Sequence, residues 1–281
     1  MKITTYRSEF VQTLTPIYDA QEAESFFYLL LEDKRQLKRV DLALDPQLEF
    51  SHSEVAEWNE VVEKLKAFIP IQYIIGKAHF FGLEFEVNSG VLIPRPETEE
   101  LVQWIVAENV EQSDLKILDI GTGSGCIAIS LAKNLPQAQV FAIDISEAAL
   151  ETARNNANRN QVEVNFIQNN ILEMSDLEQQ FDVIVSNPPY VRNLEKEEIK
   201  KNVLDHEPHL ALFVDDHDAL VFYRKIAHLA VKHLRKGGQL YFEINQYLGK
   251  EMMDLLEQNG FQQMELRKDI YGNNRMVFGK I

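Results

Sequence analysis

Apolar residues in the first quarter of the chain recur at helical spacing. Residues 25–40 and 53–69 carry them at every third or fourth position, as one face of an amphipathic helix requires. Ser53, followed by Glu54, is predicted to cap the second of these helices. The pattern therefore predicts a small helical domain that spans residues 1–76.

The pattern changes at residues 77–94. Aromatic and apolar residues stand on both sides of Gly82 within residues 77–87, which is typical of two short strands joined by a tight turn. So short a hairpin needs support from neighbouring elements. We interpret residues 77–94 as a β-hairpin linker between two domains.

Strands and helices then alternate along residues 95–281. Seven apolar segments are predicted strands: 116–120, 139–145, 164–168, 181–187, 239–245, 261–266 and 275–281. Most are separated by helical patterns, at 98–108, 127–134, 147–159, 220–234 and 248–258. This alternation predicts an α/β domain with a mostly parallel, doubly wound sheet.

Turn residues refine this prediction. Gly237 and Gly260 stand where C-caps of the last two helices belong. The final two strands are separated only by a turn at residues 271–274, which leaves no room for a crossover helix. That pair of strands is therefore predicted to be antiparallel.

Composition narrows the function classes. The 281 residues hold 28 basic and 44 acidic side chains, and the net charge of −16 argues against a protein that chiefly grips nucleic-acid phosphates. The one cysteine, Cys126, excludes an internal disulfide framework. No N-terminal apolar segment resembles a signal peptide and no run is long enough to span a membrane, so we expect a cytoplasmic protein.

A glycine-rich loop follows the first predicted strand of the α/β domain. Its residues are Asp119, Gly121, Thr122, Gly123, Ser124 and Gly125. A dinucleotide fingerprint would need glycine at Cys126, and the lysine of a phosphate-binding loop is missing, so NAD and ATP sites are disfavoured. Asp144 ends the next strand, where a carboxylate can accept hydrogen bonds from ribose hydroxyls. S-adenosylmethionine, a nucleoside without phosphates, fits this pattern, although helix-capping acids and turn glycines would explain the same residues.

The segment Asn187, Pro188, Pro189, Tyr190 follows the fourth strand, at the sheet edge that also carries the glycine loop. Two prolines donate no backbone N–H and fix the chain, which leaves carbonyl oxygens free to accept. The Asn187 side-chain oxygen and the Pro188 carbonyl would orient a planar NH₂ group for methylation, with Tyr190 as an apolar wall. A rigid loop without chemistry is the alternative interpretation.

Together these motifs resemble the amino-methylating class I methyltransferases, and further segments resemble one family, the PrmC (HemK) peptide chain release factor glutamine N5-methyltransferases. These segments are Gln72–Gly76, Phe81-Gly82, Leu92–Glu99, Glu207-Pro208 and Glu243-Ile244. The chain departs from the family pattern at Asn170, Ile171, residues 214–216 and Asn245.

The resemblance implies a Rossmann-like, seven-stranded methyltransferase sheet with a helical substrate-recognition domain. It implies that S-adenosylmethionine is used to methylate the glutamine of the Gly-Gly-Gln motif in release factors, which are the expected partners. The residues expected to bind the cofactor are those of the glycine-rich loop together with Asp144, Ile145, Asn170, Ile171 and Asn187. The residues expected to bind the substrate are Arg95, Glu97, Asn187, Pro188, Pro189 and Tyr190. Arg95 and Glu97 could equally stabilise only the start of a helix.

Two other functions stay open. An adenine amine of DNA or RNA presents the same planar NH₂ as glutamine, so the motif alone does not exclude a nucleic-acid methyltransferase. Basic residues at 196–201 are interleaved with acids, which favours a solvated helix face and argues against stable nucleic-acid binding. A non-catalytic nucleoside-binding module is the other alternative. His206 and His209 have no further ligands nearby in the sequence, so no metal site is expected.

Overall fold

The computed structural model describes residues 1–281 and divides into two compact units. The first comprises residues 1–76 and 200–206, and the second comprises residues 77–199 and 207–281. The hairpin at residues 77–86 thus belongs to the second unit, and residues 200–206 belong to the first although the sequence pattern did not indicate it. None of the helices combines the length and apolar character that crossing a bilayer requires.

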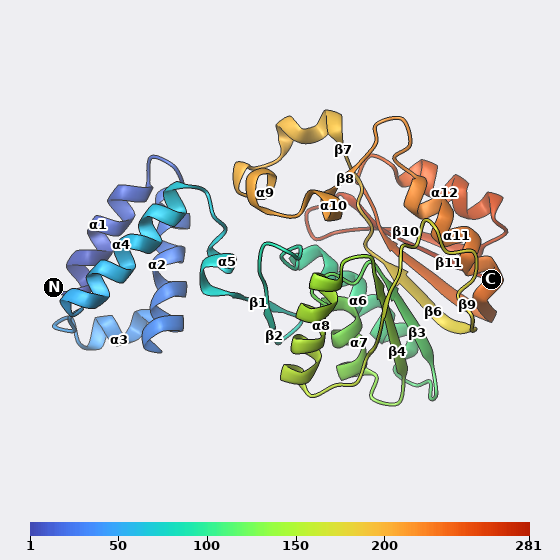
Figure 1. The fold of residues 1–281 in the computed structure, drawn as a ribbon, viewed down its shortest axis with the longest axis horizontal. Coiled ribbons are helices and arrows are strands. Elements are labelled where there is room, and N and C mark those ends of the chain that lie inside the picture. Colours follow the sequence, from blue (N-terminus) through green and yellow to red (C-terminus); the bar gives the residue numbers. More distant parts are fainter. The chain divides into compact units, whose positions relative to one another are not determined.

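The first unit is helical (Figure 1). Its N-terminal part comprises α1 (Ile3–Leu14), α2 (Ala20–Arg35), α3 (Arg39–Leu44), α4 (His52–Lys66) and α5 (Ile71–Ile75). Trp58 lies at the centre of an aromatic core, with ring contacts to Tyr6, Phe10, Phe27 and Phe50. Helix α1 was not predicted, although its buried residues follow helical spacing.

The start of α4 differs from the prediction by two residues. Ser51, not Ser53, is the N-cap, because its hydroxyl accepts from the Glu54 N–H while the Glu54 carboxylate accepts from the Ser51 N–H. This reciprocal pair satisfies two backbone donors that the helix leaves unpaired. Glu54 is thereby at the third helical position, where a capping box places it.

Helix α9 (Lys201–His206) completes the first unit. The His206 ring nitrogen Nε2 lies 2.8 Å from the Ala67 carbonyl oxygen, and the Lys201 ammonium lies 4.5 Å from the centre of the Phe68 ring. These contacts join a segment late in the chain to the end of α4.

The second unit contains a seven-stranded sheet. Its strands are β3 (Lys116–Ile120), β4 (Gln139–Asp144), β5 (Asn165–Gln168), β6 (Phe181–Ser186), β9 (Leu234–Glu243), β10 (Gln262–Lys268) and β11 (Asn274–Lys280). The order is β10-β11-β9-β6-β3-β4-β5. Neighbours from β9 to β5 pair in parallel, whereas β11 is antiparallel to both β9 and β10. The predicted doubly wound sheet with an antiparallel final pair is confirmed.

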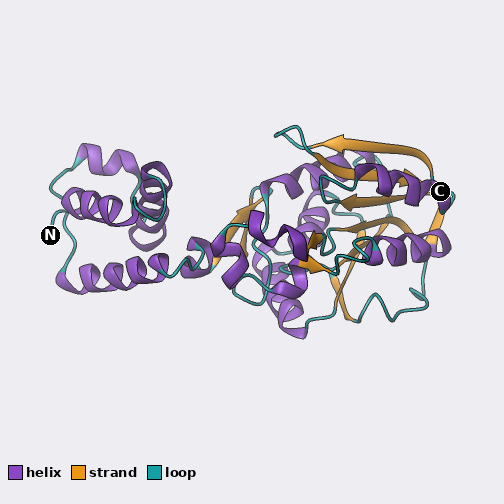
Figure 2. Ribbon diagram, turned by 90° about the horizontal axis from the view of Figure 1, so that it is seen from above, coloured by secondary structure: helices purple, strands orange, loops and turns teal.

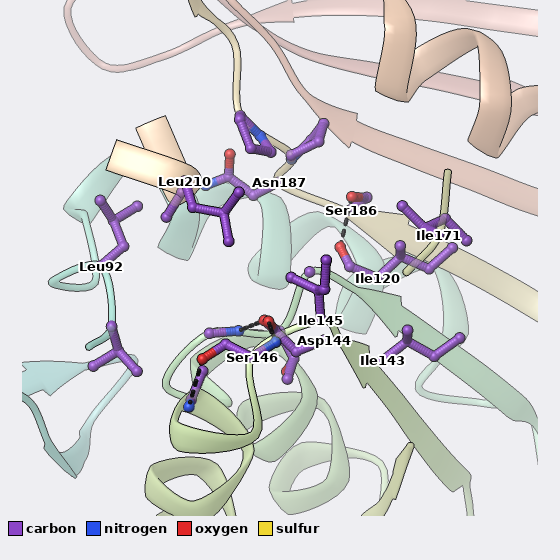
Figure 3. Close-up of a pocket in the computed structure, with 18 of the residues that line it drawn as sticks. Leu92, Ile120, Ile143, Asp144, Ile145, Ser146, Ile171, Ser186, Asn187 and Leu210 are labelled. Atoms are coloured by element: carbon purple, nitrogen blue, oxygen red, sulfur yellow. Dashed lines mark hydrogen bonds between the residues drawn. The ribbon is translucent and has the colours of Figure 1, made fainter. Parts of the chain in front are cut away.

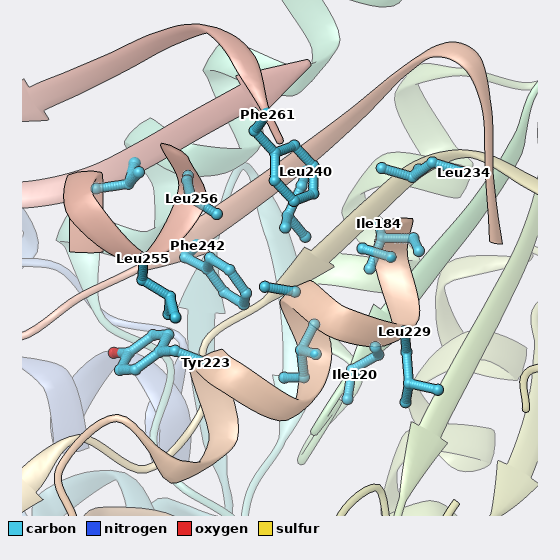
Figure 4. Packing of buried hydrophobic residues seen from close by; sticks show 14 of the residues in the cluster. Ile120, Ile184, Tyr223, Leu229, Leu234, Leu240, Phe242, Leu255, Leu256 and Phe261 are labelled. Atoms are coloured by element: carbon cyan, nitrogen blue, oxygen red, sulfur yellow. The ribbon is translucent and has the colours of Figure 1, made fainter. Parts of the chain in front are cut away.

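Helices cover both faces of this sheet (Figure 2). One layer consists of α6 (Pro96–Asn109), α7 (Cys126–Asn134) and α8 (Glu147–Asn160), and the other of α11 (Val221–His233) and α12 (Gly249–Gln258). Successive strand residues point to opposite layers: Ile117 packs with α6 and α7, and Leu118 packs on the α11 side. Figure 4 shows the core on the α11 side, which also contains Ile120. This alternation explains why the strands read as continuous apolar runs.

The remaining elements are short. Strands β1 (Lys77–Phe80) and β2 (Leu83–Glu86) form the predicted hairpin around Gly82. Between β6 and α11 lie β7 (Val191–Arg192), the 3₁₀ helix η1 (Asn193–Glu198), α9, α10 (His209–Leu212) and β8 (Phe213–Val214), with β7 and β8 paired in parallel.

The two predicted C-cap glycines have different outcomes. Gly260 follows the C-cap residue of α12, Asn259, with a φ of 87°, and its N–H donates to the Glu257 carbonyl, as a helix-ending glycine does. The prediction for Gly237 is wrong, since it lies inside β9, where the register against β6 shifts. There its φ of 80° fits a bulge, and its N–H donates to the Ile281 carbonyl.

Candidate active site

A cavity of about 320 Å³ lies in the second unit, beyond the carboxyl ends of β3, β4 and β6 (Figure 3). Strand β3 has β4 on one side and β6 on the other, and the chain reverses its strand order there. Open α/β sheets bind ligands at such a crevice. The glycine loop after β3 and the Asn-Pro-Pro segment after β6 both line this one cavity.

The glycine loop turns sharply from β3 into α7. The N–H groups of Gly121 and Thr122 both donate to the Ile143 carbonyl, which ties the loop to β4. Gly121, Gly123 and Gly125 all have positive φ, between 56° and 83°. Gly125 has a second reason to be glycine, because a Cβ there would lie 2.8 Å from Ile129 Cδ1. Its role is thus the packing of α7, and only the first two glycines line the cavity.

Asp119 lies beneath the loop with no solvent-exposed surface. Its Oδ2 accepts a 2.6 Å hydrogen bond from the Thr122 hydroxyl. Burial raises the pKa of Asp119 from 3.8 to about 7, and the neighbouring Asp144 carboxylate acts in the same direction, against the hydrogen bonds from Thr122 and the Ala128 N–H. Asp119 is therefore placed to hold the glycine loop from beneath.

The raised pKa predicts a pH-dependent stability. Between about pH 4 and pH 7 the unfolded chain releases the Asp119 proton while the folded chain retains it, so this group makes folding less favourable as pH rises through that range. Asp119→Asn removes the titration. Without cofactor, the melting temperature of the variant minus that of wild type should be small near pH 4, grow up to about pH 7 and then level off. A difference independent of pH would contradict the raised pKa.

Asp144 ends β4 and faces the cavity, opposite Asn187 (Figure 3). Its Oδ2 accepts from the Gly123 N–H at 2.8 Å and its Oδ1 accepts from the Ser146 N–H at 2.9 Å. A carboxylate can accept about four hydrogen bonds, so each oxygen retains a free acceptor position. Asp144 thus has a fixed orientation and two sites left for hydroxyl donors.

Apolar side chains flank this carboxylate. Ile145, 45% exposed, and Ile171, buried at 8%, both line the cavity and leave a flat ring an aliphatic surface on which to pack. Asn170 also lines it, but its side chain serves its own loop: Oδ1 accepts from the Leu172 N–H and Nδ2 donates to Glu173. The predicted cofactor role of Asn170 therefore rests on its backbone position and not on a free amide.

The Asn-Pro-Pro segment forms the opposite wall. Asn187, Pro188 and Pro189 all line the cavity. Just before them, the Ser186 hydroxyl donates at 2.6 Å to the Ile120 carbonyl, which joins the ends of β6 and β3. The two motifs that the sequence placed at one sheet edge are thereby held in a fixed relation.

The side-chain amide of Asn187 is connected to a buried carboxylate. Its Nδ2 donates to the Thr98 hydroxyl at 3.4 Å, and that hydroxyl donates to Glu243 Oε2 at 2.6 Å. Glu243 is 1% exposed, and its burial raises its pKa above the usual value, against the hydrogen bonds of Thr98 and Tyr190 and the charge of Arg275. Neither Thr98 nor Glu243 was assigned a role from the sequence.

Tyr190 occupies a different place from the one predicted. It is not among the residues that line the cavity, and its hydroxyl donates to Glu243 Oε1 at 3.1 Å. Its backbone carbonyl accepts from Asn245 Nδ2 at 3.1 Å. In this structure Tyr190 therefore supports the carboxylate behind the Asn-Pro-Pro wall, because its ring packs into the core beside α11.

The mouth of the cavity comes from two distant segments. Arg95 lines it and donates at 2.6 Å to Glu207 Oε1, while Glu207 Oε2 accepts from the Ile93 N–H at 3.2 Å. This buried carboxylate joins the segment before α6 to the segment that carries Pro208 and Leu210, which sequence reasoning did not place at the site. Glu97 lies in the first turn of α6, outside the cavity lining.

Other reactive groups give the cavity little chemistry. Burial raises the pKa of the Cys126 thiol to about 12, so this cavity residue stays a neutral thiol at neutral pH. No group of three or more His, Cys, Asp or Glu side chains is arranged to hold a metal ion. The site thus offers hydrogen-bond acceptors and apolar walls and no activated nucleophile.

Comparison with known proteins assigns both parts of the chain. A methyltransferase small domain model matches residues 98–210, and a PrmC N-terminal domain model matches residues 6–76. A release factor glutamine methyltransferase of Flavobacterium psychrophilum is 62% identical over 99% of this chain and 98% of its own length. The chain belongs to the release factor glutamine methyltransferase family. A second family member, from Bacteroides thetaiotaomicron, is 46% identical over 95% of each chain.

Solved structures agree on the fold. A methyltransferase from Pyrococcus furiosus matches with a TM-score of 0.53 and 21% identity over 78% of this chain and 98% of that one. The catalytic domain of hMettl16 matches with a TM-score of 0.56 and 17% identity over 71% and 75%. At such low identity these likenesses establish the methyltransferase fold alone.

S-adenosylmethionine is the cofactor of this methyltransferase family, and the cavity fits it. The Asp144 carboxylate would accept the ribose hydroxyls at its two remaining acceptor positions, and Ile145 and Ile171 would give the adenine aliphatic walls. The backbone at Gly121 and Gly123 lines the cavity. No phosphate-binding lysine follows these glycines, which suits a nucleoside that carries no phosphate. Asp119, which was predicted to bind the cofactor, lies beneath this turn, fully buried and outside the cavity lining.

Proposed function

We propose that this chain methylates the side-chain amide nitrogen, N5, of the glutamine in the Gly-Gly-Gln motif of peptide chain release factors. The observation that carries this proposal is the meeting of the Asp144 carboxylate and the Asn187 amide in one cavity. The names of full-length relatives at up to 62% identity support the substrate. A release factor as substrate would place the activity with the cytoplasmic translation machinery.

The chemical difficulty is the weak nucleophilicity of an amide nitrogen, whose lone pair is delocalised into its carbonyl. When bound, S-adenosylmethionine would supply an electrophilic methyl group on a positively charged sulfur, which keeps the electron pair of the broken S–C bond and leaves as a neutral thioether. Asn187 Oδ1 and the Pro188 carbonyl would each accept one N–H of the glutamine amide, which directs the nitrogen lone pair into the cavity. The same two oxygens stabilise the positive charge that grows on nitrogen as the new C–N bond forms.

No strong base is required by this arrangement. The nitrogen becomes acidic only after it has gained the methyl group, so its extra proton leaves readily to solvent or to an acceptor oxygen. The contribution of the protein is therefore positioning and charge stabilisation, which in well-aligned intramolecular systems reaches roughly 7–11 kcal/mol. This agrees with a cavity that holds acceptors and a neutral thiol.

We also propose that the first unit helps to recognise the release factor. It matches the PrmC N-terminal domain model, and the cofactor cavity is complete within the second unit. A groove on the first unit between α1 and α4 carries Glu9, Glu60 and Glu63, and only Glu63 is paired with the one lysine of the groove, Lys66, so its net negative charge favours a basic partner surface. Glu9→Lys with Glu60→Lys should lower kcat/KM for the release factor and leave cofactor affinity unchanged, and an unaltered kcat/KM would remove this surface from recognition.

A panel of acceptors tests the function. Cofactor labelled in its methyl group is offered to an intact release factor, to the same factor with its Gly-Gly-Gln glutamine replaced by alanine, and to adenine-containing DNA and RNA. We expect label on the intact factor alone. Label on nucleic acid would favour the adenine methyltransferase instead, because the same acceptors suit its planar amine, and label on none would contradict both enzymes.

A further inference from the structure

Asn187 can work as an acceptor only if its amide is held in one of two orientations. The amide group has an oxygen that accepts and an NH₂ that donates, and rotation by half a turn exchanges them. If the NH₂ faced the substrate amide, two donors would meet and the glutamine nitrogen would be repelled. Something in the protein must therefore select the orientation with Oδ1 toward the cavity.

The hydrogen bonds behind Asn187 make that selection. The Thr98 hydroxyl donates to Glu243 Oε2 at 2.6 Å, which is the direction that an ionised carboxylate requires, since it has no proton to give. A hydroxyl has one proton, and with that proton committed the Thr98 oxygen can only accept from Asn187. The amide atom 3.4 Å from Thr98 is accordingly Nδ2, which leaves Oδ1 unpaired on the other side.

We propose that Thr98 and Glu243 are positioning residues of the methyl-transfer reaction, which fix the amide orientation of Asn187 through a one-way chain of hydrogen bonds. This inference rests on the proposed function, since it concerns the group that would hold the glutamine. These hydrogen bonds also polarise the Asn187 amide. When its NH₂ group donates to Thr98, electron density shifts toward Oδ1, which makes Oδ1 a stronger acceptor.

Burial and neighbouring groups maintain this chain. Thr98 is 3% exposed and Glu243 is 1% exposed, so water does not compete for the hydrogen bond between the Thr98 hydroxyl and the Glu243 carboxylate. The second carboxylate oxygen of Glu243 accepts from the Tyr190 hydroxyl at 3.1 Å, and the Arg275 guanidinium lies 3.5 Å from that hydroxyl. Each carboxylate oxygen thus accepts from a donor and a cation lies nearby, and these groups favour the ionised form against the burial that raises the pKa of Glu243.

Position 98 offers a matched pair of variants. Thr98→Val has nearly the same shape and no hydroxyl, so the amide of Asn187 loses its acceptor and can turn. Thr98→Ser keeps the hydroxyl and loses a methyl group. Thr152→Val is the control for removing a buried threonine hydroxyl elsewhere, since Thr152 is 4% exposed and bonds only to Asn88 and the Ala148 carbonyl.

The test measures single-turnover methyl transfer to an intact release factor, with cofactor affinity by calorimetry and melting temperature for each protein. We expect Thr98→Val to slow transfer about tenfold to a hundredfold at saturating substrate, with cofactor Kd within about twofold, by analogy with the loss of one oriented acceptor. Thr98→Ser should recover most of the rate, and Thr152→Val should transfer at the wild-type rate. Adding Thr98→Val to Asn187→Ala should slow transfer no further than Asn187→Ala alone.

Glu243→Gln gives an independent reading if Thr98→Val does not fold. A glutamine amide can donate to Thr98, which reverses the chain, so we expect slow transfer with unchanged cofactor Kd. Transfer at the wild-type rate by Thr98→Val or Glu243→Gln, or equal losses in the serine and valine variants, would overturn the positioning role. Failure of the wild-type protein to methylate the factor would instead overturn the proposed function.

Discussion

Asn187→Ala should reduce the single-turnover rate of methyl transfer by on the order of 10² or more while S-adenosylmethionine still binds. Removal of one preorganised group that stabilises transition-state charge typically has this effect. Asn187 lies on the wall of the cavity opposite Asp144, so its side chain would contact the glutamine amide and not the ribose. The measurement is rapid-quench transfer at saturating cofactor, with cofactor Kd from calorimetry.

Asn134→Ala is a suitable control for this variant. Asn134 ends α7, and its side chain donates only to the Ser130 carbonyl within the same helix. It should transfer methyl groups at the wild-type rate. If Asn187→Ala also transferred at nearly that rate, Asn187 would have no part in orienting the substrate, and the acceptor role would have to be abandoned.

Asp144→Ala should have its large effect on the cofactor instead. A hydrogen bond from a hydroxyl to a charged acceptor contributes roughly 1.5–3 kcal/mol, and Asp144 would accept two of them. Because water in the variant replaces part of this energy, we expect the cofactor affinity to fall about 10²-fold. The variant also frees the N–H groups of Gly123 and Ser146, which loosens the loop. Calorimetric titration with S-adenosylmethionine measures the affinity directly.

Asp182→Ala provides the matched carboxylate control. Asp182 lies near the start of β6, where it accepts from the Lys116 N–H and from Arg235. That position is at the end of the sheet away from the cavity, so the variant should lose some stability and keep its cofactor Kd. Equal Kd values for wild type and Asp144→Ala would exclude Asp144 from the ribose site.

The sheet could be predicted because its signals are local. Each parallel strand is buried on both faces, so neighbours such as Ile117 and Leu118 are both apolar and the strand reads as one run. The antiparallel final pair followed from the shortness of a single turn. Where two local signals compete the prediction was wrong: a glycine after a helix reads as a C-cap, yet Gly237 serves a bulge in β9.

The candidate site could be predicted only as far as its motifs are continuous in the chain. The glycine loop and the Asn-Pro-Pro segment each end a strand, and parallel strands bring such ends to one edge. The support behind them is not local, because Thr98 and Glu243 are 145 positions apart and Arg95 and Glu207 are 112 apart. Contacts between residues so far apart leave no periodic signal in the sequence. The one local indication of a buried polar group was Glu243, an acidic residue in the apolar segment that forms the end of β9.

Tandem mass spectrometry of the release factor after reaction tests the central claim most directly. The claim is that the acceptors at the Asn-Pro-Pro wall present an amide nitrogen to the cofactor methyl group. We expect one methyl group on the side-chain nitrogen of the Gly-Gly-Gln glutamine with the wild-type enzyme, and almost none with Asn187→Ala over the same time. A methyl group on another residue, or on the same glutamine to equal extent with both enzymes, would contradict the account.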